Sequence, residues 1–86
     1  MPEICRFYGI IIRMYYDDHN PPHFHAQYGN HQVIIAIGTL AVIAGVLPPR
    51  ALGLVAEWGS QHQTELEDAW ERAKTLEPPG QIDPLP

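Results

Sequence analysis

The sequence predicts a small α+β domain, in which a curved antiparallel sheet of three to five short strands is followed by one long helix packed on one face. Residues 1–47 are rich in β-branched and aromatic side chains and are divided by glycine and proline turns. Residues 48–77 repeat apolar side chains at helical spacing, with acidic residues between them. Because 86 residues suffice for one core, we expect a single domain, 1–86, ending in a loosely held proline-rich tail, 78–86.

The first candidate strands lie within residues 5–16, a run of aromatic and β-branched residues. This run is long for a single strand, and Gly9 near its middle is typical of a bulge or a tight turn. Two short strands that meet at Gly9 and one bent strand both fit the pattern.

A β-hairpin is predicted next, because two strand-like runs, 23–28 and 31–37, are separated by the two-residue turn signal Gly29-Asn30. That turn would set three opposed pairs: Tyr28 with His31, Ala26 with Val33, and Phe24 with Ile35. Because side chains alternate between the faces of a sheet, the apolar members of these pairs would share the core face. His23 and His25 would then lie together on the opposite face.

The C-terminal half predicts a helix, with one further short strand expected around residues 41–44 before it. Pro48-Pro49 suits a helix start, where the missing N–H of proline costs little, and Pro78-Pro79-Gly80 cannot continue a helix. Gly59-Ser60 is a candidate kink between these ends. The positions at helical spacing are Ala51, Leu54, Val55, Trp58, His62, Leu66, Ala69, Trp70, Ala73 and Leu76.

The net charge of −5 is confined to the C-terminal half, where seven acidic residues face only Arg72 and Lys74. An acidic surface repels phosphate backbones, so generic nucleic-acid binding is disfavoured and a protein partner with a basic surface is favoured. We find no signal-peptide pattern and no apolar stretch of the roughly 20 residues that a membrane helix needs. With a single cysteine, Cys5, the protein is expected in a reducing cytoplasm, away from membranes.

Association with another chain is expected from the size of the protein. A short chain has a thin margin between the area it buries and the entropy it loses on ordering, and an open sheet edge invites pairing. We therefore expect a homodimer or a heteromer rather than a stable monomer.

The densest chemistry lies in residues 17–25, where three of the five histidines stand beside two carboxylates. Each proline of Pro21-Pro22 fixes its own φ and restricts the residue before it, so this pair forms a stiff connector that leads into His23. If a strand follows, His23 and His25 point to the same face. Two imidazoles held side by side can bind an ion or react with a substrate.

Three interpretations of these histidines remain open. The first is a metal site formed by His19, His23 and His25 with Asp17 or Asp18, since imidazole and carboxylate suit zinc, nickel or copper. The spacing matches no zinc-finger pattern. No organic cofactor is predicted, and a divalent transition metal is the one candidate.

The second interpretation is catalysis without a metal, in which His23 and His25 act as general base and general acid. Arg13 or Arg6 would then hold a phosphate group through two parallel hydrogen bonds. This is the chemistry of a metal-independent ribonuclease or other phosphodiesterase, although the acidic charge balance disfavours it. In the third interpretation, the imidazoles are structural groups that hold the loop around Pro21-Pro22.

Two motifs resemble a small bacterial family filed as domain of unknown function 4160. They are Ile4-Cys5-Arg6-Phe7-Tyr8-Gly9 and Pro21-Pro22-His23-Phe24-His25-Ala26. Members of that family are typically encoded beside a second small protein, often of the family filed as domain of unknown function 2442, and such pairs resemble toxin–antitoxin modules. The resemblance implies a prokaryotic cytoplasm and a protein partner from a neighbouring gene. We therefore expect an interaction domain of a two-gene toxin–antitoxin-like module, with the ribonuclease and the metal-binding module as alternatives.

Overall fold

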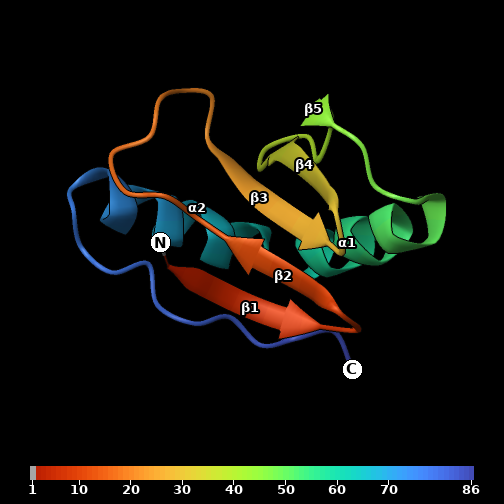
Figure 1. The fold of residues 1–86 in the computed structure, drawn as a ribbon. Coiled ribbons are helices and arrows are strands. Elements are labelled where there is room, and N and C mark those ends of the chain that lie inside the picture. The colour runs from red at the N-terminus through yellow and green to blue at the C-terminus, as the bar shows by residue number, and fades with distance from the viewer. Residues whose placement is uncertain (1) are drawn as a thin grey trace.

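Five strands form one antiparallel sheet, in which each strand pairs with the next along the chain, in the order β1-β2-β3-β4-β5 (Figure 1). The computed structural model describes residues 2–86. The strands are β1 Glu3–Phe7, β2 Ile10–Arg13, β3 His23–Tyr28, β4 His31–Ala36 and β5 Val42–Gly45. The α+β class is confirmed, and the N-terminal run forms two strands rather than one bent strand. Tyr8 and Gly9 join them with positive φ angles of 50° and 80°, as a tight hairpin turn requires.

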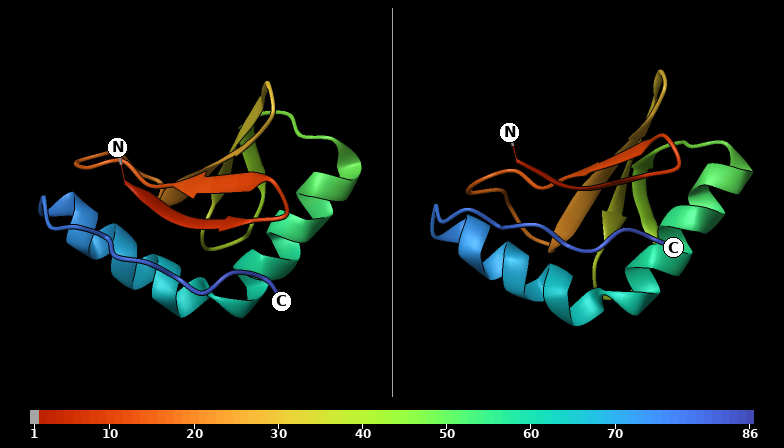
Figure 2. Two further views of the ribbon diagram at one scale, coloured as in Figure 1. Left: turned by 60° about the horizontal axis from the view of Figure 1, so that its bottom comes forward. Right: turned by 90° about the horizontal axis from the view of Figure 1, so that it is seen from below.

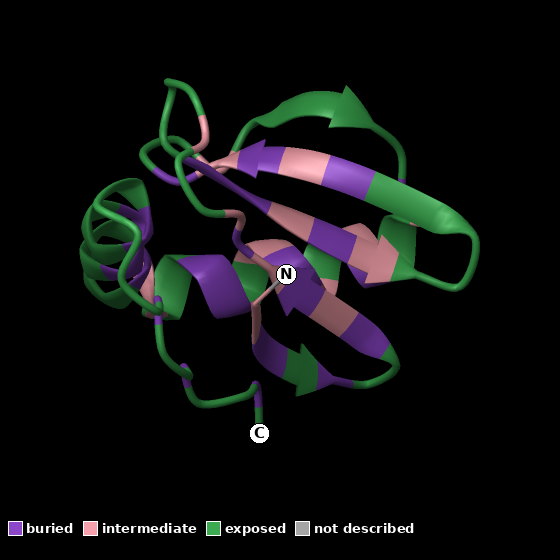
Figure 3. Ribbon diagram, turned by 60° about the vertical axis from the view of Figure 1, so that its left-hand side comes forward, coloured by how far each residue is buried: buried purple, intermediate pink, exposed green. Residues whose placement is uncertain are grey.

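The central hairpin has the predicted register. Across β3 and β4 the opposed pairs are Tyr28 with His31, Ala26 with Val33, and Phe24 with Ile35. The apolar members of these pairs are almost fully buried on one face, as the alternation of side chains predicts. Figure 3 shows this alternation along β3 and β4, and shows that β5 is exposed along its whole length.

Two helices follow the sheet, α1 Pro49–Gln61 and α2 Gln63–Lys74, so the prediction of one long helix over 48–77 is wrong. The backbone leaves the helical conformation at His62, with φ −128° and ψ 25°, and not at the expected Gly59-Ser60. Gly59 is instead buried at a close approach, since a Cβ there would lie 2.9 Å from Leu40 Cδ2. Neither helix in residues 2–86 is both long and apolar enough to cross a membrane.

Both helices pack on the same face of the sheet, and the change of direction between them lets α2 continue under β3 and the loop before it (Figure 2). The core lies between the sheet and the helices. Its largest fully buried side chains include Trp58 of α1, Leu66 of α2 and Phe24 of β3. Within residues 2–86, no helix covers the opposite face, which we call the open face, and His25 lies on it.

The C-terminal segment 79–86 lies along β1, which differs from the loosely held tail expected for 78–86. The Ile82 amide donates to the Ile4 carbonyl at 2.8 Å, and the Trp58 indole N–H donates to the Asp83 carbonyl at 2.8 Å. Ile82 and Leu85 are buried. The prolines restrict φ and so reduce the entropy lost when the segment docks, which lets two apolar anchors hold it.

Candidate functional site

The loop between β2 and β3 brings Asp18 to the start of β3. The Asp17 amide donates to the carbonyl of Ala73, near the end of α2, at 3.1 Å, which fixes the loop against that helix. Asp17 has a φ of 51°, the left-handed conformation that aspartate tolerates better than most residues. The chain reverses here, so Asp18 reaches back toward the two histidines of β3.

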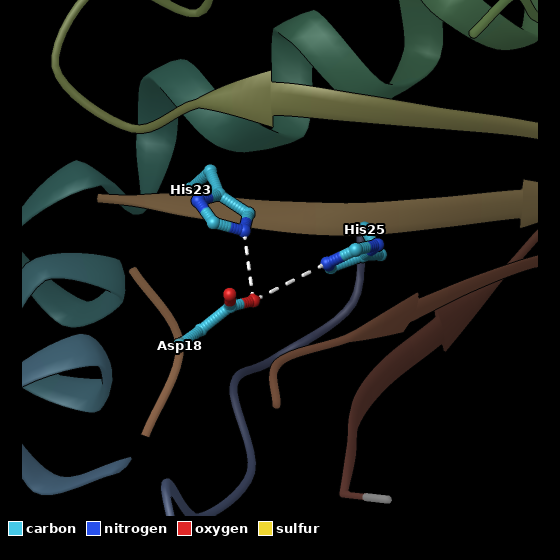
Figure 4. Close-up of side chains that lie close together, drawn as sticks. All are labelled: Asp18, His23 and His25. Atoms are coloured by element: carbon cyan, nitrogen blue, oxygen red, sulfur yellow. Dashed lines mark hydrogen bonds and ion pairs between the residues drawn. The ribbon is translucent and has the colours of Figure 1, made fainter. Parts of the chain in front are cut away.

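Asp18, His23 and His25 converge on a common point (Figure 4). Asp18 Oδ2 lies 2.9 Å from His23 Nε2 and 3.7 Å from His25 Nε2. One potential ligand atom from each residue lies within 4.8 Å of the other two. The convergence depends on strand alternation, which places both imidazoles on one face of β3.

The orientation of His23 is set by a hydrogen bond on the far side of its ring. His23 is 5% exposed, and its Nδ1 lies 2.7 Å from the Pro21 carbonyl oxygen. A carbonyl only accepts, so Nδ1 carries the hydrogen. In the neutral ring, the lone pair of Nε2 then faces the Asp18 carboxylate. Two acceptors repel each other at this distance, so the arrangement requires a cation that both can bind. That cation is either a second proton on the ring or a metal ion.

His25 contributes a nitrogen that has no hydrogen-bond partner. Its Nε2 is buried, and among residues 2–86 no donor or acceptor lies within hydrogen-bond distance of it. The edge of its ring meets Tyr15, with ring centroids 4.3 Å apart. Burial, and then the charge of His23, lower the pKa of His25, while Asp18 partly opposes this. A buried polar atom without a partner is costly, so this nitrogen is available to a ligand from outside the chain.

Asp18 is held as a carboxylate. Burial raises its pKa, but the hydrogen bond from the His19 backbone amide and the proximity of His23 outweigh that effect, and the net shift is downward. A carboxylate oxygen and two imidazole nitrogens form a donor set typical of divalent transition metals. In such sites the second nitrogen of a ligand histidine usually donates to a carbonyl or a carboxylate, as His23 does to Pro21.

The other residues predicted for this site lie outside the convergence. The His19 side chain is 88% exposed, and its Nδ1 contacts Oδ1 of Asp18 at 3.0 Å, the carboxylate oxygen turned away from His23. Asp17 contributes its backbone to the loop and is exposed. Arg6 pairs with Glu3 at 2.8 Å.

Arg13 lies beside the convergence without joining it. The register of β2 and β3 sets Arg13 directly opposite His25, so the two residues share the open face. Its guanidinium donates to the Gln27 side-chain oxygen. Arg13 is therefore a neighbour of His25 whose cationic group already has an acceptor.

A shallow cavity of about 320 Å³ opens beside His25 on the open face. Residues paired across three strands, His25, Ile34 and Ala44, form its floor. Tyr15 forms the wall nearest the imidazole. Tyr15 was not predicted from the sequence. It stands two positions after Arg13, and a period of two continued past the end of β2 would place it on the face of Arg13 and His25.

The chain matches one known family, described as "Domain of unknown function (DUF4160)", over residues 9–71. No curated protein and no solved structure gave a match. The matched region runs from the β1–β2 turn into α2 and contains all three converging residues, as well as Tyr15 and Arg13. It covers well over half of the chain, so this protein belongs to the DUF4160 family.

Proposed function

We propose that this protein binds a divalent transition-metal ion of the zinc class through Asp18, His23 and His25. The observation that carries the proposal is the buried Nε2 of His25, which has no hydrogen-bond partner and faces the same carboxylate oxygen as His23 Nε2. An ion at this point would satisfy all three donors at once. The ion would also replace the second ring proton that His23 would otherwise need in order to bind the Asp18 carboxylate.

The chain's own residues prepare the donors for this role. The Pro21 carbonyl fixes which nitrogen of His23 faces the site, and the backbone amide of His19 keeps Asp18 ionised. The cavity on the open face adjoins the site through the ring of His25, whose Nε2 is itself buried. A bound ion of this class supplies Lewis acidity, which polarises a coordinated water or carbonyl oxygen.

The direct test is calorimetric titration of the metal-free protein with Zn²⁺ or Ni²⁺, together with thermal melting in the presence and absence of each ion. We expect one ion per chain and a rise in melting temperature, because the ion binds the folded state preferentially. His25→Ala should weaken binding by more than about tenfold, since it removes a donor. His31→Ala is the matched control, because His31 is exposed at the β3–β4 turn. If neither ion produces heat or a melting shift, the metal proposal is wrong.

His19 distinguishes the two donor sets, because only the set expected from the sequence spacing includes it. His19→Ala should bind Zn²⁺ as the wild type does, since its ring is exposed and outside the convergence. Asp18→Asn should lose affinity, because it keeps the shape of the side chain and removes its charge. The opposite ranking of these two variants in calorimetry would show that His19 is the ligand.

The second candidate function is phosphodiester hydrolysis by His23 and His25 without a metal. Its specific support is that His23 pairs with Asp18 and that His25 lies beside them. Burial lowers the pKa of His25, which favours the neutral form that accepts a proton. Three results would favour this second function. The protein would cleave RNA in the presence of a chelator, the rate would follow a bell-shaped pH profile, and the folded His25→Gln variant would lose the activity. Activity that appears only after Zn²⁺ is added would favour the metal centre.

A role in a two-gene toxin–antitoxin-like module, through a neighbouring small protein, is also proposed. It rests on the family resemblance and on the acidic exposed side of α2, formed by Glu65, Glu67, Asp68 and Glu71. These acidic residues suit a partner with a basic surface. Co-expression with the neighbouring gene product should yield a complex that dissociates at high salt. If the two proteins purify separately at low salt, this role is excluded.

A further inference from the structure

The two edges of the sheet are treated differently by the chain. Along β1, the segment 79–86 covers the edge, and Ile82 and Gln81 donate hydrogen bonds to the carbonyls of Ile4 and Glu3. Along β5, no segment within residues 2–86 lies on the outer side, and all four residues of the strand are exposed. The sheet therefore has one protected edge and one open edge (Figures 1 and 2).

The open edge belongs to a strand of only four residues that pairs irregularly with β4, but its side chains do not prevent pairing. Natural edge strands commonly carry a charged side chain or a proline, but residues 39–47 contain neither. Large apolar side chains are exposed here instead: Val42 and Ile43 are 44% and 47% exposed, and the neighbouring Val46 is 67% exposed. Such an edge favours pairing with another strand.

We propose that β5 pairs antiparallel with β5 of a second copy of this chain, giving a twofold dimer with a continuous ten-stranded sheet. An antiparallel strand pair about a twofold axis is self-complementary, so the same apolar side chains face each other from both copies. The edge offers only backbone groups and largely apolar side chains, and residues 39–47 carry no charged side chain that would select a charged partner.

The distribution of charge also favours a second copy. The acidic residues of α2 are Glu65, Glu67, Asp68 and Glu71, and α2 lies at the opposite end of the molecule from β5 (Figure 1). Pairing through β5 keeps these two acidic surfaces far apart, so a net charge of −5 on each copy does little to oppose it. Pairing through α2 would place them against each other.

The dimer would change the surroundings of the cavity next to His25. Ala44 and Gly45 of β5 line that cavity at its end nearest the open edge. In the dimer the second copy's β5 extends the sheet beyond these two residues, and the open faces of both copies become one surface. The two cavities then lie on the same side of the ten-stranded sheet.

The test is analytical ultracentrifugation of the metal-free protein from about 1 to 300 μM, since pairing of short strands buries less area than a standard interface. We expect a reversible dimer with a micromolar dissociation constant. Ile43→Lys and Val46→Lys should each weaken it at least tenfold, because each places two like charges, one from each copy, in an apolar contact. Leu76→Lys is the control, since Leu76 is 68% exposed and lies far from β5 in the chain.

Hydrogen exchange on the same samples separates lost pairing from lost folding. In the wild type, the β5 amides that face outward should exchange more slowly as concentration rises. In Ile43→Lys this protection should disappear, while β1 to β4 keep theirs. A monomer over the whole concentration range would overturn the proposal, and this is also the result expected if β5 pairs with a different protein. A dimer that both lysine variants leave intact would overturn it as well. Because the protein is metal-free throughout, the outcome does not depend on metal binding.

Discussion

At the scale of single residues, the protonation of His25 links the site to stability. Burial, and then the charge of His23, lower its pKa below the unfolded value of 6.5. The unfolded chain therefore binds a proton more readily than the folded one near that pH. The contribution of neutral His25 to the free energy of unfolding is complete above about pH 6.5. It is lost as the pH falls toward the pKa of His25 in the folded protein. The lowered pKa of Asp18 acts in the same direction, but only below its ordinary value of 3.8.

We predict that the free energy of unfolding of the metal-free protein falls as the pH drops below about 6.5, and that His25→Gln removes much of this fall. Urea denaturation at several pH values in a chelator measures it. His31→Gln is the control, because it removes a histidine that is exposed at the turn. A His25→Gln variant with an unchanged pH dependence would show that another group titrates in this range.

Residue by residue, the site could be predicted in part. Alternation along a strand is local, so the shared face of His23 and His25 followed from the sequence. The choice of Asp18 over His19 did not, because it depends on how the β2–β3 loop is fixed. That loop is held by the Asp17 amide and the carbonyl of Ala73, 56 residues later, a contact that has no signal in the local sequence.

At the scale of secondary structure elements, the two glycines of α1 have opposite surroundings. Gly53 is exposed, and a Cβ there would meet no atom within 4 Å. Gly59 is buried, and a Cβ there would press on Leu40. The sequence presents both only as helix-weakening residues. The position of the helix break at His62, instead of Gly59, therefore depends on packing that periodicity does not reveal.

We predict that Gly53→Ala raises the free energy of unfolding by about 0.5–1 kcal/mol, because alanine is the better helix former and nothing opposes its side chain. Gly59→Ala should raise it less or lower it, since Leu40 must move. Thermal or urea denaturation of the two variants side by side checks this ranking. Equal stabilisation by both would mean that Leu40 moves aside without cost.

At the scale of the whole molecule, the C-terminal segment completes the core. Ile82 and Leu85 are 6% and 7% exposed, and they lie with β1 and Trp58. The proline content of this segment suggested a loose tail, because composition does not show that two apolar residues meet a matching surface. In a small domain such additional burial is a sizeable part of total stability.

We predict that Ile82→Ala lowers the free energy of unfolding by about 2 kcal/mol, at the lower end of the range for buried aliphatic side chains because the segment can partly collapse. Leu76→Ala should change it by less than about 0.5 kcal/mol, since that side chain is exposed. Urea denaturation measures both. Equal effects would indicate that the segment leaves β1 in solution.

The cover on β1 also has a consequence for synthesis. The contacts between Tyr8 and Pro86, and between Glu3 and Gln81, each join residues 78 positions apart. A ribosome therefore releases β1 long before it adds the segment that protects it, and a nascent chain carries a bare edge in the meantime. We expect folding to finish only once this segment has left the ribosome. The test compares nascent chains that end before residue 79 with chains that include residues 79–86, each extended by a linker long enough to hold it outside the exit tunnel. The shorter chains should aggregate more readily.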